Sequence, residues 1–304
     1  LIQNSFWWIE YAGIDGIRMD TYPYADFDGM AEWMKELNEE YPNFNVVGES
    51  WVTEPAYTAY WQKDSKLSAP RNSHLKTVMD FSLYDKINQA KNEESTEDWK
   101  GLNRIYNNFV YDYLYPNPSS VMAFLDNHDT NRFLEDGNDI AELKQAVTLL
   151  LTIPRIPQLY YGTEIMMNGR KNVSDGYVRK DFPGGWAGDA QNAFTKEGRT
   201  PIQNEIFDYI SKLLHWRKDN AVISEGTMKH FIPQNGIYVY VRSFEGKAAM
   251  VILNGTNKEQ VLPIKHYNEV LNNATTGKDI ISEKNIDLTK DITLNPKQSM
   301  IIEL

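Results

Sequence analysis

The sequence predicts an α/β fold with parallel strands, followed by a small antiparallel β domain. Three observations lead to this prediction. Over residues 1–219, short apolar runs alternate with stretches of helical period. Three of the apolar runs end in a carboxylate, at Asp20, Glu49 and Asp129. After residue 219 the pattern changes to short strands separated by turn signals, so we expect domains at 1–219 and 220–304.

Five strand–helix units are expected in the first domain. They follow the end of an amphipathic helix that Gly13 stops. The expected strands are Gly16 to Asp20, Phe44 to Gly48, Thr77 to Phe81, Ser120 to Leu125 and Ile156 to Tyr161. Helical stretches are expected from a cap at Asp26 or Asp28 to a point before Pro42, and at 83–92, 99–113, 140–151 and 206–214.

A long loop is expected at 163–199. Its part from Val173 to Arg199 is rich in Gly and Asp and has no period, and a loop of this length is usually functional. Asp175 and Asp181 suggest a cation site there, although solvated loop carboxylates are the simpler explanation. In the second domain we expect strands at 227–232, 237–244, 248–253, 260–264 and 299–303.

The composition limits the classes of function. A chain of 304 residues with 41% hydrophobic residues can build a large domain and a small one. The formal charge of −11 opposes nucleic-acid binding. The absence of Cys excludes disulfides, thiolate metal sites and a cysteine nucleophile. No stretch of the sequence reaches the ~18 apolar residues of a membrane span.

The three carboxylates predict a glycosidase. Acidic residues at the carboxyl ends of parallel strands gather at one face of an α/β barrel. Cleaving an acetal needs one carboxylic acid to protonate the leaving oxygen and one carboxylate to attack or stabilise the sugar cation. Arg18 lies two residues before Asp20, so both side chains point to one face of the strand, and the guanidinium can hold the carboxylate.

Each of these residues also has a structural explanation. Arg18 and Asp20 can form an ordinary ion pair, Glu49 can be an exposed strand end, and His128 can be a hydrogen-bonded structural residue. Judged singly, the structural explanation is favoured in each case. The joint pattern reverses this preference, because three independent strand ends would have to imitate one active site.

Four motifs in order give the chain a specific resemblance. It resembles the α-amylase superfamily of glycoside hydrolases and, within it, enzymes of the neopullulanase and cyclomaltodextrinase type. The motifs are Gly13-Ile-Asp-Gly-Ile-Arg-Met-Asp20, Val47-Gly-Glu-Ser-Trp51, Phe124-Leu-Asp-Asn-His-Asp129 and Ile156-Pro-Gln-Leu-Tyr-Tyr-Gly-Thr-Glu164. A further stretch, Arg179-Lys-Asp-Phe-Pro-Gly-Gly-Trp186, is similar to neopullulanase-like members. The resemblance implies the C-terminal part, strands four to eight, of a (β/α)8 TIM barrel.

The resemblance also implies residue roles. Asp20 is expected to be the nucleophile, Glu49 the general acid and base, and Asp129 the group that binds the distorted sugar. The candidate substrate-binding residues are Arg18, His128, Tyr22, Trp51 and Arg132. Asp126 and Asn127 are expected to orient the strand end before Asp129. For Trp51, Tyr22 and Trp186, packing and sugar stacking remain equal alternatives.

The expected function is therefore retaining hydrolysis of α-1,4-glucosidic bonds in starch-derived oligosaccharides, pullulan or cyclodextrins. An α-glucan transglycosylase and a non-catalytic carbohydrate-binding homologue stay open as alternatives. The expected partner is an α-glucan oligosaccharide. No cofactor or metal ligand is firmly implied, and calcium is an open question for the full-length enzyme. The resemblance weakly favours a periplasmic or extracellular location.

The chain departs from the family pattern in two places. Thr21-Tyr-Pro-Tyr24 stands where many amylases carry a Lys-His pair. The first three strands of the family barrel have no counterpart, and the chain starts at Leu1 without an initiator Met or a signal-type run. We therefore expect a fragment that is inactive in isolation. An incomplete barrel has open edges, so the missing N-terminal half or a homo-oligomer is the expected protein partner.

Overall fold

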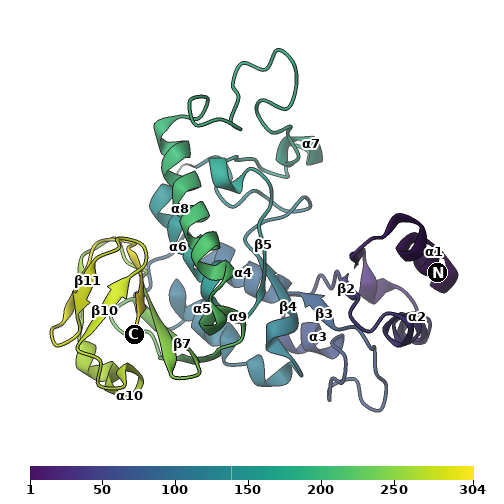
Figure 1. The fold of residues 1–304 in the computed structure, drawn as a ribbon, viewed down its shortest axis with the longest axis horizontal. Helices are drawn as coiled ribbons and strands as arrows, with labels where there is room; N and C mark the ends of the chain where they lie inside the picture. Colours follow the sequence, from purple (N-terminus) through teal and green to yellow (C-terminus); the bar gives the residue numbers. More distant parts are fainter. Residues whose placement is uncertain (138) are drawn as a thin grey trace. The chain divides into compact units, whose positions relative to one another are not determined.

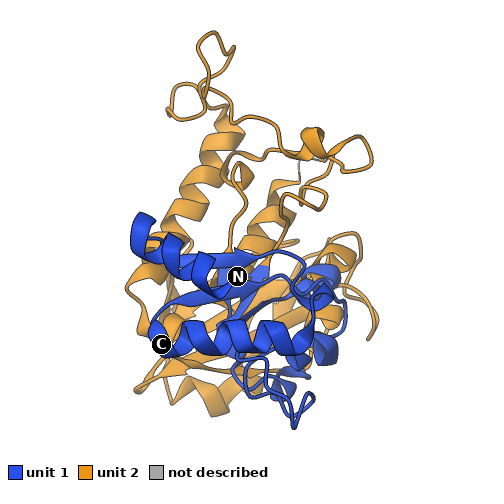
Figure 2. Ribbon diagram, turned by 90° about the vertical axis from the view of Figure 1, so that its right-hand side faces the viewer, with its two compact units in different colours: residues 1–86, 107–123, 155–157 blue, residues 87–106, 124–154, 158–304 orange. Residues whose placement is uncertain are grey.

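The structure, a computed structural model, describes residues 1–137 and 139–304. The chain forms two compact units, shown in Figure 2. Unit 1 comprises residues 1–86, 107–123 and 155–157, and unit 2 comprises residues 87–106, 124–154 and 158–304. Unit 2 contains both the last long helix and the antiparallel sheet. The expected boundary between residues 219 and 220 therefore stays a prediction.

A five-stranded sheet forms the centre of unit 1 (Figure 1). Its strands lie in chain order: β1 (Gly16–Met19), β2 (Asn45–Gly48), β3 (Thr77–Met79), β4 (Val121–Phe124) and β5 (Ile156–Gln158). The pairs β1·β2, β2·β3 and β3·β4 are parallel. Phe124 and Gln158, the last residues of β4 and β5, are assigned to unit 2. The five expected strands are all present, each shorter than its apolar run.

Two helices of unit 1 match an expected start or stop signal. Helix α1 (Ile2–Ala12) ends at Gly13, which has a left-handed φ of 61°. Helix α2 (Phe27–Glu40) is capped by Asp26 rather than Asp28, because the Asp26 carboxylate accepts the backbone N–H of Gly29. Its apolar face packs into the core of the unit. Helix α3 (Pro55–Tyr60) was not expected, since six residues are too few to show a helical period.

The remaining helices either join the units or belong to unit 2. They are α4 (Phe81–Ala90), α5 (Leu102–Phe109), α6 (Ile140–Thr152), α7 (Asp175–Val178), α8 (Pro201–Lys218), α9 (Ala221–Ser224) and α10 (Asn268–Leu271). Thr200 and Gln203 form a capping box at the start of α8. The expected loop at 163–199 is not wholly irregular, because it contains α7 and a short 3-10 helix, and its Ser174 caps α7.

An antiparallel sheet of six strands lies in unit 2, in the order β11-β10-β13-β8-β7-β6. The strands are β6 (Thr227–His230), β7 (Ile237–Phe244), β8 (Lys247–Asn254), β10 (Thr276–Asp279), β11 (Asn285–Asp287) and β13 (Ser299–Glu303). A separate pair joins β9 (Gln260–Leu262) and β12 (Ile292–Leu294). Strands β10, β11 and β12 were not expected, because they are short and lie in a mostly polar stretch without an apolar run.

The fold is completed by single-turn 3-10 helices at Tyr22–Tyr24, Asp112–Leu114, Pro118–Ser120, Thr163–Ile165 and Ile264–Tyr267. Within the described ranges, no helix combines the length and the apolar character needed to cross a bilayer. The architecture is thus a parallel α/β sheet with helices in one unit and an antiparallel β sheet in the other.

Candidate active site

Strands β1 and β2 place Asp20 and Glu49 side by side in unit 1. Their parallel register pairs Met19 with Gly48, so the two acids are the next residues of neighbouring strands. The Glu49 N–H donates to the carbonyl oxygen of Met19 at 2.9 Å, which extends the ladder to this level. Because neighbouring strands lie roughly 4.8 Å apart, the two carboxylates are brought to one edge of the sheet.

Arg18 links the two carboxylates. One terminal nitrogen of its guanidinium donates to Asp20 Oδ1, and the other donates to Glu49 Oε1 at 2.5 Å. The second oxygen of Glu49 accepts the backbone N–H of Thr21 at 2.8 Å. Two oxygens held by the terminal nitrogens of one planar guanidinium are necessarily close together.

The two acids differ in their exposure to solvent. The Asp20 side chain is 64% exposed, whereas the Glu49 side chain is only 5% exposed. The structural explanation of Glu49 as an exposed strand end is therefore wrong. The Arg18–Asp20 ion pair is present, but Arg18 also binds Glu49, so the pair is part of a three-residue constellation.

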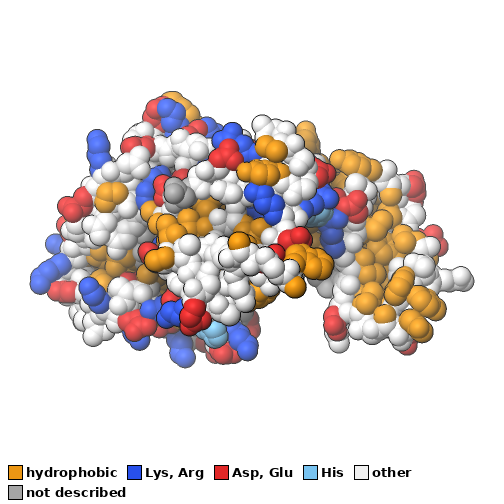
Figure 3. All heavy atoms as spheres, turned by 90° about the horizontal axis from the view of Figure 1, so that it is seen from above, with side chains coloured by type: hydrophobic (Ala, Val, Ile, Leu, Met, Phe, Trp, Pro, Cys, Tyr) orange, Lys and Arg blue, Asp and Glu red, His pale blue; other side chains and the backbone are white. Residues whose placement is uncertain are grey.

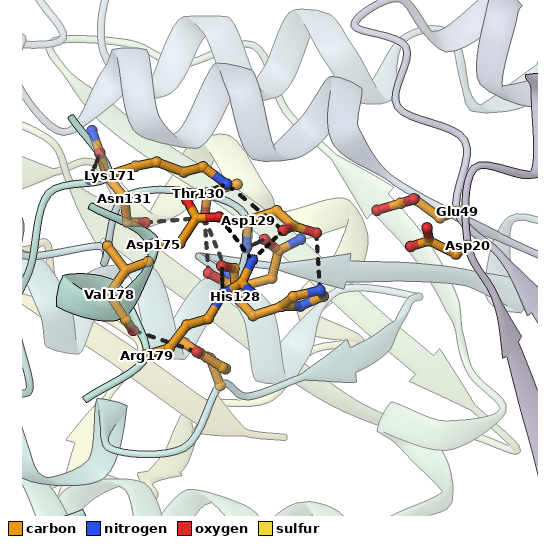
Figure 4. Close-up of polar contacts among 12 residues, drawn as sticks. Asp20, Glu49, His128, Asp129, Thr130, Asn131, Lys171, Asp175, Val178 and Arg179 are labelled. Carbon is orange, nitrogen blue, oxygen red and sulfur yellow. Dashed lines mark hydrogen bonds and ion pairs between the residues drawn. The ribbon is translucent and has the colours of Figure 1, made fainter. Parts of the chain in front are cut away.

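In unit 2, Asp129 is surrounded by basic side chains, as Figure 4 shows. Its Oδ2 lies 2.9 Å from His128 Nε2, and its Oδ1 accepts from a terminal nitrogen of Arg179 at 2.8 Å. Lys171 Nζ lies 3.7 Å from the same Oδ1. The Asp129 N–H donates to Asn127 Oδ1 at 2.8 Å, so Asn127 orients the turn that follows β4 and carries Asp129.

Arg179 and Lys171 are the residues of this cluster that the sequence analysis did not assign. The Arg179 Nε also donates to the carbonyl oxygen of His128 at 2.8 Å. The available signal was the position of Arg179 at the start of the motif that ends at Trp186. Asp175 pairs with Lys171 at 3.2 Å and with Arg179 at 3.6 Å. Within residues 1–137 and 139–304, no group of three acidic, His or Cys side chains is arranged to hold a metal ion.

Asp126, which shortly precedes Asp129 in the sequence, is buried and has a structural role. Its Oδ2 accepts the backbone N–H of Phe133 at 2.8 Å, which fixes the turn after β4. Burial raises the pKa of Asp126 to about 6, because removing the carboxylate from water disfavours its charged form.

Two predicted substrate contacts need correction. Tyr22 is 0% exposed and lies in the core of unit 1, where its ring meets Trp61 edge to face at 5.9 Å. Arg132 is also 0% exposed, and its Nε donates to the carbonyl oxygen of Val178 at 2.9 Å. Its guanidinium lies over the ring of Tyr160. Side chains buried in this way hold the fold and are not available to stack on or bind a sugar.

The other two aromatic candidates are exposed. Trp51 is 44% exposed and stacks one face on Phe81, with ring centroids 4.7 Å apart. Trp186 is 66% exposed, while its backbone N–H is held by the Asp189 carboxylate at 3.2 Å. Trp51 therefore packs on one face and is partly open to solvent, and Trp186 stands out on a fixed turn.

Two known families match the chain. Residues 3–203 match the α-amylase catalytic domain, and residues 228–303 match the cyclo-malto-dextrinase C-terminal domain. An α-amylase from Niallia circulans is 29% identical over 286 residues, which cover 90% of this chain and 48% of that protein. A cyclomaltodextrin glucanotransferase from Geobacillus stearothermophilus is 28% identical over 287 residues, covering 90% and 35% respectively. The chain thus spans about half, or less, of the length of these relatives.

Solved structures show the same fold. The crystal structure of the α-amylase from Geobacillus thermoleovorans, complexed with acarbose, has a TM-score of 0.79 with this chain at 24% sequence identity. The superposition covers 100% of this chain and 62% of that one. At this level of identity, the similarity concerns the fold alone.

Proposed function

The chain belongs to the α-amylase family, and from this premise we propose that the protein is a retaining glycoside hydrolase. Its proposed substrates are the α-1,4-glucosidic bonds of starch-derived oligosaccharides, pullulan or cyclodextrins. The five parallel strands would then be strands four to eight of a (β/α)8 barrel.

One observation carries the proposal, namely the constellation of Asp20, Glu49 and Arg18 at the ends of β1 and β2. Retaining glycosidases hold their two carboxyl groups about 5–5.5 Å apart, whereas inverting enzymes leave room for a water between them. Two carboxylates on neighbouring strands, bound to one guanidinium, fit the shorter separation. This supports a retaining rather than an inverting reaction.

In the proposed first step, an oxygen of Asp20 attacks the anomeric carbon as the bond to the leaving oxygen breaks. Glu49 gives its proton to that oxygen, and a glycosyl ester forms on Asp20. In the second step Glu49 takes a proton from water, whose oxygen attacks the anomeric carbon and releases Asp20. Arg18 and the Thr21 N–H each occupy one oxygen of Glu49, and each oxygen keeps a second position that can face the leaving oxygen.

Asp129 would accept hydrogen bonds from sugar hydroxyls and stabilise the cationic transition state. Both of its oxygens are already oriented, by His128 and by Arg179. His128 is 40% exposed, so it remains open to a ligand. Within unit 2, Arg179 and Lys171 are thus the residues that position Asp129.

Transglycosylation is the second candidate reaction. It shares the glycosyl ester on Asp20 and differs only in that a sugar hydroxyl, not water, attacks it. The similarity of the chain to a cyclomaltodextrin glucanotransferase supports transglycosylation as a candidate reaction. A non-catalytic carbohydrate-binding homologue is less favoured, because all three expected acids are present and oriented by hydrogen bonds.

The test is an assay of the full-length protein on maltoheptaose, pullulan and β-cyclodextrin. We expect Asp20→Asn and Glu49→Gln each to lower kcat by at least about 10³-fold, because each acid takes part in bond making or breaking. Asp15→Asn, a change of an exposed acid just before β1, is the matched control and should leave kcat within about twofold. Nuclear magnetic resonance of the first product should show the α-anomer. Full activity of Asp20→Asn, or a β-anomer, would contradict the proposal.

The surface of unit 1 also supports a protein partner. Strand β1 is the edge of its sheet, with β2 as its one neighbour in the described structure. On the adjoining helix α1, three large aromatic side chains, Trp7, Trp8 and Tyr11, are 49%, 46% and 74% exposed. Figure 3 shows hydrophobic side chains gathered on its right-hand side, where α1 lies. We propose that further polypeptide covers this surface in the active protein.

A further inference from the structure

Unit 2 contains a pocket with no part in the proposed reaction. Its volume is ≈ 590 Å³, within the range of roughly 300–1,000 Å³ that is usual for small-molecule sites. It lies where the end of α8, the start of α9, the β7–β8 hairpin and the end of β13 meet. Six of its lining side chains carry the argument: Trp216, Asp219, Phe244, Glu245, Lys247 and Glu303.

The aromatic part of the wall is fixed in place. The indole Nε1 of Trp216 donates to Glu303 Oε1 at 2.7 Å. The side-chain amide of Asn220 donates to the same oxygen at 3.4 Å. Trp216 and Phe244 are both partly buried, and both line the cavity. A ligand therefore meets rigid, flat apolar surfaces.

The backbone around the pocket is equally well defined. Phe244 pairs with Lys247 across a two-residue turn in which Glu245 and Gly246 have φ values of 47° and 81°. Such a turn matches the twist of a hairpin. The Leu304 N–H donates to the carbonyl oxygen of Ala248 at 2.9 Å, which ties β13 to β8. Because these walls are already ordered, a ligand does not have to order them on binding.

The charges of the pocket select the class of ligand. The carboxylates of Asp219, Glu245 and Glu303 outnumber the single ammonium of Lys247, which opposes an anionic ligand. Within residues 1–137 and 139–304, the side chains of Asp219, Glu245 and Lys247 form no hydrogen bond or ion pair with one another or with other residues. Nor do His, Cys, Asp and Glu side chains form a cluster there that could hold a metal ion. Free carboxylates accept hydrogen bonds from hydroxyls, so the pocket suits a neutral ligand with many hydroxyl groups and apolar faces.

We propose that this pocket is a second, non-catalytic binding site for a short segment of neutral α-glucan. Apolar C–H faces of the pyranose rings contact Trp216 and Phe244, and their hydroxyls donate to Asp219 and Glu245. The choice of an α-glucan among neutral sugars rests on the proposed function. The consequence is that a long glucan is held at two places on one protein, which raises its effective concentration at the reacting site.

Affinity electrophoresis in gels with and without soluble amylopectin tests this proposal. Asp20→Asn serves as the parent, so that the polysaccharide is not digested during the run. We expect this parent to be retarded, and Phe244→Ala added to it to raise the dissociation constant about tenfold. Glu245→Asn, in the exposed turn, should weaken binding as well without disturbing the core, since Asn readily adopts a positive φ.

Two matched controls lie outside the pocket in the same unit. Ile232→Ala removes an apolar side chain that is 66% exposed, and Glu259→Asn removes an exposed acid. Both should leave retardation unchanged. The proposal is overturned if the parent is not retarded, if both pocket variants bind like the parent, or if the controls weaken binding equally. Thermal unfolding checks that the Phe244→Ala variant is folded. If it is not, the retardation of the Glu245→Asn variant alone decides whether the pocket binds the glucan.

The same experiment separates this inference from the proposed function. If the unsubstituted protein does not hydrolyse maltoheptaose and yet the pocket variants lose retardation, the proposed function fails and the second site stands. If hydrolysis is normal but retardation does not depend on the pocket, the second site fails alone.

Discussion

Arg18 sets the local geometry of the candidate site in unit 1. A lysine ammonium is a single point charge, whereas the planar guanidinium presents two terminal nitrogens that reach Asp20 and Glu49 at once. The spacing of Arg18 and Asp20 along one strand was readable in the sequence. The contact with Glu49 depends on the pairing of β1 with β2.

Asp126 makes stability depend on pH. Its raised pKa, about 6 against ~3.9 in an unfolded chain, means that the folded protein holds this proton more tightly. Its contribution therefore favours folding below about pH 4 and is lost as pH rises to about 6, a difference of roughly 3 kcal/mol. Asp126→Asn should remove this decrease in the free energy of unfolding with rising pH. The amide oxygen of the new side chain can still accept the Phe133 N–H.

Urea unfolding at several pH values between about 4 and 7 measures the effect. The quantity to compare is the change in the free energy of unfolding with pH, not its absolute value, since Asn alters the buried hydrogen bonds. Asp208→Asn, a change of an exposed acid on α8, is the control and should keep the natural pH dependence. An Asp126→Asn protein with the same pH dependence as the natural one would refute the assignment.

At the scale of elements, Gly48 lets β2 bring Glu49 to its position. A Cβ at residue 48 would lie 2.5 Å from Leu75 Cδ2 and 3.1 Å from Tyr22 Cγ, and both neighbours are fully buried. Gly48→Ala should therefore lower the free energy of unfolding by about 1–3 kcal/mol through overpacking. It should also reduce hydrolysis, because the adjacent Glu49 moves with the strand.

Gly29→Ala is the matched control. Gly29 lies in the first turn of α2, where the new Cβ would meet only Asp26 Oδ1 at 3.4 Å. Removing a helical glycine should leave stability unchanged or raise it by up to about 1 kcal/mol. Urea unfolding compares both variants, and equal stability of Gly48→Ala and the natural protein would show that the strand adapts without cost.

At the scale of the whole molecule, the aromatic surface of α1 predicts self-association of this chain. Trp7 and Tyr11 stack at 4.6 Å and Trp8 meets Trp7 edge to face at 4.7 Å, so the three rings form one continuous exposed surface. Such surfaces in water favour contact with another apolar surface. Sedimentation velocity should show association that increases with concentration and is reduced by Trp7→Gln with Tyr11→Lys.

Tyr24→Lys is the control for this surface. Tyr24 is 76% exposed in the same unit but lies outside α1, so its replacement should not change association. A natural chain that sediments as a monomer at all concentrations would show that this surface does not drive association.

The order and type of the main elements followed from the sequence. Apolar runs and helical periods gave five parallel strands with helices between them, then an antiparallel sheet, because side-chain periodicity is a local property. Periodicity did not reveal α3, β10, β11 and β12. Helix α3 is too short to establish a period, and the three strands lie in a mostly polar stretch without an apolar run. The sequence allows either Asp26 or Asp28 to cap α2, and the hydrogen bond from the Gly29 N–H to the Asp26 carboxylate identifies Asp26 as the cap.

The sequence by itself determined that Asp20 and Glu49 directly follow strands and that Asp129 lies in the segment after β4, because that depends only on local order along the chain. Only the tertiary structure decided which side chains surround them and which are accessible. Strand pairing joined Arg18 to Glu49, and a distant loop brought Arg179 to Asp129. Burial removed Tyr22 and Arg132 from the candidate contacts. Exposure and contact depend on residues far apart in the chain, which no local pattern reports.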